Sequence, residues 1–334
     1  MTTPTVVIVN YNGASTLPTC LEALQKQSAP PSVIVVDNAS QDGSLEAAAR
    51  AFPNVAFVPL RHNVGFARAF NIGVSRIPAS DGVVIALNPD THPNTDFIEQ
   101  LVAPLHEQRF VGSVAGTLTF TTSPHTIASA GIAVHRNGVA IDARLGETLT
   151  DGMRATVPVF GASGGAAAYR LSVFRAVGGY CEPFFLYLED VDLAWRMRLA
   201  GYESVWNPLA VARHDYSASA GEGSPFKRRL IARNRIWTLA RCLPFTVWQR
   251  DWKSILALDA AALGYGALTM DPAARGRLEA LPALPIRLRE GAYIRSRSVI
   301  STQEIDRWLH PSLSARELRR LRQLTGDLAK KSTI

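Results

Sequence analysis

The stretch Asp81-Gly-Val-Val-Ile-Ala-Leu-Asn88-Pro89-Asp90-Thr91 decides the fold of this 334-residue chain. Its five apolar residues, 83–87, lack the alternation of a half-exposed strand, which is typical of a strand buried on both faces. Pro89 cannot continue a central strand, so the strand ends there and Asp90 stands at its carboxyl edge. Ligands bind at that edge in open α/β sheets. An aspartate at a turn also commonly caps a helix, so a helix beginning within residues 91–97 is the alternative.

The composition is that of an ordinary globular protein, with 47% apolar and 19% charged residues and room for one large domain or two modest ones. No run reaches the roughly 18 apolar residues of a membrane-spanning helix, because Asp259 interrupts the best one, residues 255–270. The N-terminus does not resemble a signal peptide. Three widely spaced cysteines, Cys20, Cys181 and Cys242, fit a reducing compartment and no metal cluster. We therefore expect a cytoplasmic protein.

Strands and helices alternate in the first third of the chain. Apolar, β-branched runs at 5–10, 32–37, 55–59 and 83–87 are separated by helical stretches of about a dozen residues. This alternation predicts crossover connections, and hence an α/β fold with a mainly parallel central sheet and flanking helices.

Three of these strands end in polar residues, at Asn10 to Asn12, at Asp37-Asn38 and at Asn88 to Asp90. Ends of parallel strands meet at one edge of a sheet, so the sequence predicts a pocket there. No G-x-G-x-x-G or P-loop motif follows the first strand, which disfavours dinucleotide-binding and P-loop functions. A mononucleotide bound by Asp, Asn and a metal is the class that remains.

The pattern changes to short strand-like runs between residues 110 and 170. Asn137-Gly138 separates two such runs, 132–135 and 139–141, and predicts a β-hairpin. The small residues around Gly164 and Gly165 predict a close backbone approach, either to a packed neighbour or to a ligand.

A second stretch that can carry chemistry leads through aromatic residues to Glu189, Asp190 and Asp192. These acids begin a helix that is expected to run to about residue 200. Acids in a first helical turn are favoured by the helix dipole, but three in four residues exceed what a cap needs. Arg196 follows Asp192 by four residues, so this pair is expected to anchor the helix. His214 ends a later strand-like run and by itself indicates a structural residue.

The net charge of +7 is unevenly distributed. Residues 1–212 contain 13 Lys and Arg against 17 Asp and Glu, whereas residues 213–334 contain 22 against 11. The basic helix expected at 225–241 mixes Arg and Lys with Trp and Leu, as helices on anionic membranes do. Packing on the preceding domain, with a solvated basic face, is the alternative. Nucleic acid is not an expected partner, because no recognition module is visible. Residues 314–331 are expected to form a charged helix.

In their order along the chain, these motifs resemble those of the GT-A fold glycosyltransferases of family 2, most closely the bacterial rhamnosyltransferase-like branch. The resemblance covers residues 5 to about 235. The matching segments are Asn10-Tyr11-Asn12-Gly13, Val36-Asp37-Asn38-Ala39-Ser40-x-Asp42-Gly43-Ser44, Asn63-Val64-Gly65-Phe66-Ala67-x-Ala69-x-Asn71-x-Gly73, Leu87-Asn88-Pro89-Asp90-Thr91, Glu189-Asp190-Val191-Asp192-Leu193-x-x-Arg196, His214 and Ser217-x-Ser219-x-Gly221.

The resemblance implies a GT-A catalytic domain at residues 1–224, with a nucleotide-sugar half at about 1–110 and an acceptor half at about 111–224. A basic helical region, 225–334, follows. It further implies a metal-dependent, inverting transfer that uses Mg²⁺ or Mn²⁺. The implied donor is dTDP-L-rhamnose or a UDP-sugar, and the implied acceptor is a hydroxyl of a cell-envelope glycan or of a lipid-linked sugar. A peripheral contact with an anionic membrane on its cytoplasmic face is also implied.

The resemblance also assigns roles to individual residues. Asp190 matches the base for the acceptor hydroxyl, and Glu189 is expected to orient the acceptor. Asp90 and His214 match the metal ligands, although Asn88 stands where many members carry the first aspartate of the D-x-D motif. Asp37 matches the residue that binds the imide of uracil or thymine. The full nucleotide-binding set is Asn10, Tyr11, Asn12, Asp37, Asn38, Asn63, Gly65, Asn71 and Asn88, and the candidate acceptor floor is Gly164 and Gly165.

Two other classes of function are open to a chain with these motifs. A sugar-phosphate nucleotidyltransferase would need a Gly-rich loop with Lys or Arg after the first strand, and residues 10–15 are not such a loop. A non-catalytic sugar-nucleotide or membrane-binding module would not need both Asp90 and Asp190.

Overall fold

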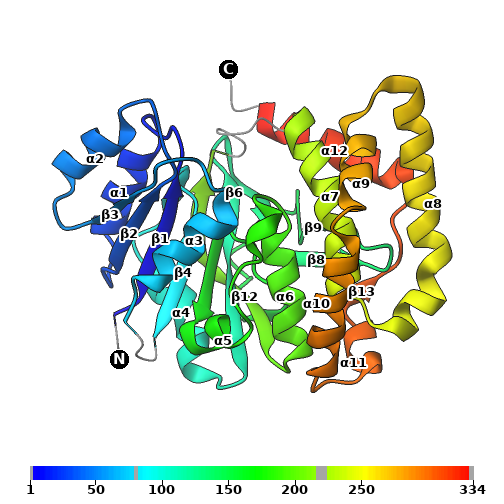
Figure 1. Ribbon diagram of the computed structural model, residues 1–334. Helices are drawn as coiled ribbons and strands as arrows, with labels where there is room; N and C mark the ends of the chain where they lie inside the picture. The colour runs from blue at the N-terminus through cyan, green and yellow to red at the C-terminus, as the bar shows by residue number, and fades with distance from the viewer. Residues whose placement is uncertain (1–2, 79–81, 216–223, 331–334) are drawn as a thin grey trace.

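Figure 1 shows the computed structural model, which describes residues 3–78, 82–215 and 224–330. Its first third has the predicted alternation of strands and helices. These elements are β1 (Thr5–Asn10), α1 (Leu17–Gln25), β2 (Ser32–Asp37), α2 (Ser44–Ala51), β3 (Ala56–Pro59), α3 (Phe66–Ser75) and β4 (Val83–Leu87). The four strands are parallel in the order β3-β2-β1-β4. All five residues of β4 are buried, as the uninterrupted apolar run predicted.

Strands from the middle of the chain extend this sheet to ten strands within the described residues. They are β5 (Thr91–Pro93), β6 (Val111–Phe120), β7 (Ser123–Ser129), β10 (Val157–Pro158), β11 (Ala166–Arg170) and β12 (Glu203–His214). β11 pairs antiparallel with both β4 and β6, and β12 runs parallel to β6. The sheet is therefore mixed, with a parallel half that ends at β4.

Helices cover both faces of the sheet because each buried strand alternates its side chains between two apolar cores. Val6 and Ile8 of β1 pack in the core beneath α1, α2 and α4 (Phe97–Glu107). Val7 and Val9 pack in the opposite core, with α3, α5 (Leu171–Ala176) and α6 (Glu189–Leu199). A 3₁₀ turn, η1 (Glu182–Phe184), leads into α6.

A helix does begin within residues 91–97, but only at Phe97 and with Asp96 as its N-cap, so Asp90 does not cap it. Thr91 starts β5, which pairs antiparallel with the end of β12 so that Thr91 lies opposite His214. A strand forms here because β12, more than a hundred residues later in the chain, offers its backbone as a partner. This pairing brings Asp90 beside His214.

The predicted hairpin is confirmed as β8 (Ile132–His135) and β9 (Ala140–Asp142), which pair antiparallel. A short C-terminal strand, β13 (Leu309–His310), joins β8 to make a second, three-stranded sheet. The C-terminal region thus contributes to the same body as the hairpin.

The remaining helices form a stack at one end of the sheet, on the side away from β1–β3 (Figure 1). They are α7 (Pro225–Cys242), α8 (Phe245–Thr269), α9 (Pro272–Ala280), α10 (Leu284–Ser296), α11 (Thr302–Asp306) and α12 (Ala315–Lys330). None of the helices, as far as the structure describes the chain, is long and apolar enough to cross a bilayer.

Helix 225–241 packs on the preceding domain, as the alternative to a membrane contact predicted, but most of its basic side chains are paired and not simply solvated. α7 packs among α6, α9 and α10. Its Arg235 is buried and pairs with Asp259 of α8 at 2.7 Å. Arg228 pairs with Asp271, and Arg229 with Glu279. The acidic partners come from helices later in the chain, so the composition of α7 alone did not reveal them.

Candidate functional site

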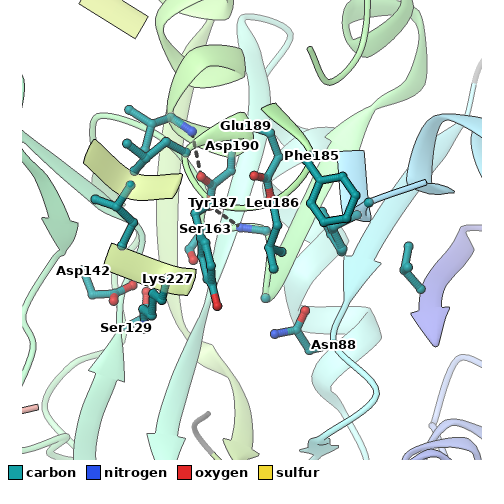
Figure 2. Close-up of a pocket in the computed structure, with 18 of the residues that line it drawn as sticks. Asn88, Ser129, Asp142, Ser163, Phe185, Leu186, Tyr187, Glu189, Asp190 and Lys227 are labelled. Atoms are coloured by element: carbon teal, nitrogen blue, oxygen red, sulfur yellow. Dashed lines mark hydrogen bonds between the residues drawn. The ribbon is translucent and has the colours of Figure 1, made fainter. Parts of the chain in front are cut away.

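A cavity of about 880 Å³ opens at the carboxyl ends of β1 and β4. Its walls come from both halves of the chain: the ends of the parallel strands on one side, and β9, the segment before α6 and the first turn of α7 on the other. In Figure 2, Asp142, Ser129 and Lys227 lie on one side of the cavity and Asn88 on the other, with Asp190 at the top between them. This volume suits a ligand of several hundred daltons.

Asp190 is held in the cavity wall by two backbone donors. The amide of Gly164 donates to Oδ2 at 2.9 Å, and the amide of Val191 donates to Oδ1 at 2.8 Å. Burial raises the pKa of Asp190 above its ordinary value, against the two hydrogen bonds, which lower it. The result is a fixed carboxylate with increased basicity, which is what a general base needs.

The neighbouring Glu189 lies in different surroundings. It is buried, and within the described residues its Oε2 has no hydrogen-bond partner. Burial, followed by the charge of Asp190, raises the pKa of Glu189 well above its ordinary value. Adjacent carboxyl groups in such different environments take different roles. Asp190, with its two N–H donors, is the member of the pair that keeps its negative charge more readily.

The segment 184–188, which leads to Glu189 and Asp190, has a strained backbone and is hydrogen-bonded by a side chain of another helix. Phe185, Tyr187 and Leu188 all have positive φ, between 63° and 69°, which costs non-glycine residues of order 1–3 kcal/mol each. Asn234 of α7 is fully buried and donates to the carbonyls of Phe184, Leu186 and Tyr187 at 2.7–3.0 Å. A side chain from the C-terminal region therefore fixes the segment that leads to Glu189 and Asp190.

Close packing holds the same segment from the other side. Gly65 has φ +84°, and a Cβ on it would lie 2.5 Å from the ring of Phe185. Glycine is therefore required at this position, because any side chain would push the segment out of place.

Asp90 and His214 form a second polar group in the cavity. Nε2 of His214 lies 3.0 Å from Oδ1 of Asp90, and Nδ2 of Asn88 lies 3.4 Å from the same nitrogen. Burial raises the pKa of Asp90, but the charge and hydrogen bond of His214 outweigh it and lower the pKa overall. For His214 burial lowers the pKa, and Asp90 reverses the direction and raises it.

These two residues are the ones that fit a divalent cation. A carboxylate and an imidazole converge on one point of the cavity, which provides two ligands of suitable chemistry. Within the ranges that the structure describes, no group of three or more His, Cys, Asp or Glu could hold a metal. Magnesium and manganese sites with few protein ligands are completed by water and substrate phosphates. The residues fit a cation that binds together with a diphosphate.

Comparison with known sequences decides the family. Residues 5–178 match the sequence model described as Glycosyl transferase family 2. This chain belongs to glycosyl transferase family 2. It is an enzyme of that family, and its sequence is similar to those of bacterial rhamnosyltransferases.

Two relatives show that similarity. N-acetylglucosaminyl-diphospho-decaprenol L-rhamnosyltransferase of Mycobacterium tuberculosis is 30% identical over 241 residues, which cover 65% of this chain and 77% of that protein. The O-antigen chain rhamnosyltransferase WbaN of Salmonella anatum is 30% identical over 217 residues, which cover 64% of this chain and 66% of that protein.

Solved structures of glycosyltransferases share the fold. GalNAc-T7, solved with UDP, GalNAc and Mn²⁺, superposes with a TM-score of 0.61 at 18% identity, over 89% of this chain and 58% of that chain. The mannosyltransferase PcManGT of Pyrobaculum calidifontis, solved with GDP-Man and Mn²⁺, has a TM-score of 0.52 at 17% identity, over 98% of this chain and 84% of that chain. The predicted GT-A fold is confirmed.

The structure of this family 2 glycosyltransferase brings most of the predicted site residues into one cavity. The predicted residues that line it are Tyr11, Asn38, Asn63, Gly65, Asn88, Asp90, Gly164, Gly165, Glu189, Asp190 and His214. The sequence left open whether the small residues around Gly165 approach a ligand or a packed neighbour. Gly165 lines the cavity and also packs near Leu118 and Asn88.

Four predicted nucleotide-binding residues lie outside this lining. Asp37 is 2% exposed, and its carboxylate accepts from Asn10 at 2.9 Å and from the Ser40 hydroxyl at 2.6 Å. Asn12 accepts from the Gln41 amide and so joins the two loops at the ends of β1 and β2. These contacts hold the loops at the ends of β1 and β2, next to the cavity.

Asn71 is the fourth, and it connects two elements instead. Its side chain donates to the carbonyl of Tyr180 at 2.8 Å and accepts from the amide of Tyr180 at 3.1 Å. This two-point contact fixes α3 to the segment that precedes η1. The motif residues Ser217, Ser219 and Gly221 lie outside the described residues.

Sequence reasoning missed two residues of the site. Asp142 ends β9, lines the cavity, and its charge raises the pKa of both Asp190 and His214. The signal was an acid directly after the predicted hairpin strand. Asn234 was missed because the helix that contains it was interpreted only by its charged residues. An uncharged amide between Arg233 and Arg235 was the feature that could have indicated it.

Proposed function

We propose that this glycosyltransferase moves L-rhamnose from dTDP-rhamnose, or a sugar from a UDP-sugar, to a hydroxyl of a saccharide carried on a polyprenyl diphosphate. The observation that carries the proposal is the shared cavity of Asp190 and the Asp90–His214 pair. The cavity combines a candidate base for an acceptor hydroxyl with candidate ligands for a cation that would bind the diphosphate. The rhamnosyltransferase from Mycobacterium tuberculosis, by its name, acts on a sugar linked to diphospho-decaprenol.

In the proposed reaction Asp190 accepts the proton of the acceptor hydroxyl. The oxygen then forms a bond to the anomeric carbon on the face opposite the nucleotide, and the bond from that carbon to the diphosphate oxygen breaks. The electron pair of the broken bond leaves with the nucleoside diphosphate, so the anomeric configuration is inverted. A positioned base contributes about 10²–10⁴-fold to such a step. Glu189, adjacent to Asp190 in the wall, orients the acceptor.

Asp90 and His214 are the residues that would hold a divalent cation. When bound, such a cation supplies positive charge for the diphosphate. Asn38, Asn63 and Tyr11 line the opposite part of the cavity, where the nucleoside is proposed to lie. Asp37 is proposed to recognise a pyrimidine from beneath this surface.

A nucleotide panel tests the donor class. We expect UDP or dTDP to raise the thermal unfolding temperature more than GDP or ADP does, and Mn²⁺ to increase the shift with a nucleoside diphosphate more than it does alone. Equal shifts for all four nucleotides would remove pyrimidine recognition by Asp37 from the proposal. Transfer of labelled rhamnose from dTDP-rhamnose to a short-chain polyprenyl-diphospho-GlcNAc then tests the reaction. Nucleotide binding without transfer to this or other glycan acceptors would favour a non-catalytic module.

A further inference from the structure

Glu189 has a carboxyl group that is buried in the cavity wall without being satisfied. The residue is 5% exposed and lines the cavity, and its Oε2 is enclosed with no hydrogen-bond partner among the described residues. Buried polar atoms in folded proteins are nearly always paired, so this exception needs a functional reason. A charged carboxylate oxygen is costly to enclose without a donor, whereas the carbonyl oxygen of a neutral carboxylic acid costs much less. The enclosure of Glu189 therefore favours its protonated form.

The charges nearest to Glu189 are negative and favour the same form. Asp190 follows it directly, and Asp192 lies in the same first turn of α6. Burial, then the charge of Asp190 and last that of Asp192 raise the pKa of Glu189 well above its ordinary value. Asp192 has Arg196 and Arg241 as ion-pair partners, so the charge of Asp190 is the less compensated of the two. Adjacent carboxyl groups in such a site share one proton more readily than they both ionise.

The hydrogen bonds around the two acids place this shared proton on Glu189. The backbone amides of Gly164 and Val191 donate to the carboxylate of Asp190 and stabilise its charge. The enclosed Oε2 of Glu189 receives no such donor from the described residues. The pair therefore consists of an ionised Asp190 and a neutral Glu189.

Three other titratable groups lie near the pair or line the same cavity. Burial, and to a lesser extent the two acids, raise the pKa of the hydroxyls of Tyr169 and Tyr180, so both tyrosines stay neutral. These hydroxyls lie 3.0 Å apart and bond to each other. Lys227 of α7 lines the cavity, but Figure 2 shows it on the side of Asp142 and apart from Glu189. None of these three groups places a positive charge against Glu189.

We propose that Glu189 is a neutral carboxylic acid that donates a hydrogen bond to an oxygen of the acceptor beside the attacked hydroxyl. Its Oε1 is the oxygen that can meet a ligand, because Oε2 is enclosed. While Asp190 accepts the proton of one acceptor oxygen, Glu189 holds a neighbouring hydroxyl or acyl carbonyl. Acceptors without that oxygen are rejected, because the O–H of Glu189 would be left unpaired. The role toward the acceptor rests on the proposed function, whereas the protonation state of Glu189 does not.

Infrared spectroscopy of the full chain tests the protonation state without any substrate. Protein labelled with ¹³C at the side-chain carboxyl of glutamate separates the signal of Glu189 from that of Asp190. At pH 7 we expect a carboxylic acid band, although an ordinary glutamate is ionised above about pH 4.3. Glu189→Gln should remove this band. Glu107→Gln is the matched control, since it removes an exposed glutamate at the end of α4 and should leave the band unchanged. A wild-type spectrum without the band would overturn the proposal, whatever reaction the enzyme catalyses.

Kinetics with the short-chain polyprenyl-diphospho-GlcNAc test the hydrogen bond. Glu189→Gln keeps a donor at the same place, so we expect a kcat/KM close to that of the wild type, whereas Glu189→Ala should lose about tenfold or more. Circular dichroism checks that both variants are folded.

A set of acceptor analogues, each lacking one oxygen of the GlcNAc, then locates the contact. One analogue should be a poor acceptor for the wild type and should cause no further loss in Glu189→Ala, because both changes remove the same hydrogen bond. A Glu189→Gln enzyme as slow as Glu189→Ala would show that the negative charge is needed and would overturn the proposal. Additive losses for every analogue would also overturn it.

Discussion

At the scale of single residues, the proposed reaction depends on two adjacent carboxyl groups that the fold treats differently. Asp190 receives two backbone hydrogen bonds, whereas the Oε2 of Glu189 receives none from the described residues. Hydrogen bonds to a carboxylate favour its charged form, and burial without them favours the neutral form. These surroundings favour Asp190 over Glu189 as the proposed base, which is the role that the family resemblance implied for it.

Replacing each acid in turn tests this division. Asp190→Asn keeps the shape but removes the basicity, so we expect transfer to fall by about 10²-fold or more while donor and metal still bind. Asp90→Ala should instead weaken metal-dependent donor binding, with partial recovery at high Mn²⁺. Steady-state transfer and calorimetric donor binding measure the two effects. Near-normal transfer by Asp190→Asn would exclude it as the base and make Glu189 the next candidate.

The pH dependence of transfer follows from the same surroundings. Asp190 must be ionised to accept a proton, and burial raises its pKa above the ordinary value of about 3.9. Activity should therefore be lost, as the pH falls, at a higher pH than an exposed aspartate would give. Asp142 contributes to this rise through its charge, so Asp142→Asn should move the acid limb of kcat/KM to lower pH. An unchanged limb in Asp142→Asn would show that the limb belongs to another group.

At the scale of elements, α7 is the helix of the C-terminal region that contacts the segment before the proposed catalytic residues. It brings Asn234 to three carbonyls of the strained segment before α6. It also brings Arg241 to the fully buried Asp192, which pairs with Arg196 as well. These contacts fix the start of α6, and hence the direction of the catalytic pair.

Asn234→Ala should destabilise the fold and slow transfer together. The carbonyls of Leu186 and Tyr187 would lose this donor, whereas that of Phe184 keeps Arg233 and the Leu186 amide, and an unsatisfied buried group costs about 1–3 kcal/mol. Thermal unfolding and the separate values of kcat and KM measure the change. Thr238→Ala, four residues on in α7, removes only a local hydrogen bond to the Asn234 carbonyl and serves as the control. A kcat as high as that of the control would show that α7 does not position the catalytic pair.

At the scale of the whole molecule, the GT-A domain and the C-terminal helices share one structure. The first turn of α7 forms part of the cavity wall, and β13 completes the small sheet with β8 and β9. We therefore propose that the chain changes architecture near residue 224 without dividing there into two independently folding units.

Residues 1–224 alone should therefore fail to unfold cooperatively and should bind UDP or dTDP more weakly than the full chain. Removing Arg241 leaves Asp192 buried with one partner in place of two, and breaking a buried pair costs about 3–5 kcal/mol. Differential scanning calorimetry and nucleotide titration of the shortened protein measure both effects. Cooperative unfolding with full nucleotide affinity would show that the catalytic domain is autonomous.

The sequence by itself determined the parallel strands, the hairpin, the start of α6 and the family. Each of these depends on a pattern within a few neighbouring residues: a buried apolar run, Asn137-Gly138 at a turn, or acids at a helix start. Through the resemblance of its motifs to family 2, it also identified Asp90, Asp190 and His214 as candidates.

Only the tertiary structure decided which charges are exposed. Arg228, Arg229 and Arg235 of α7 pair with acids 24 to 50 residues later in the chain, whereas Arg241 pairs with Asp192, 49 residues earlier. Thr91 lies in a strand because β12 pairs with it. Asn234 stabilises the segment between η1 and α6 because that segment packs against α7. Such contacts join residues far apart in the chain, and local patterns contain no information on which distant surface will cover them.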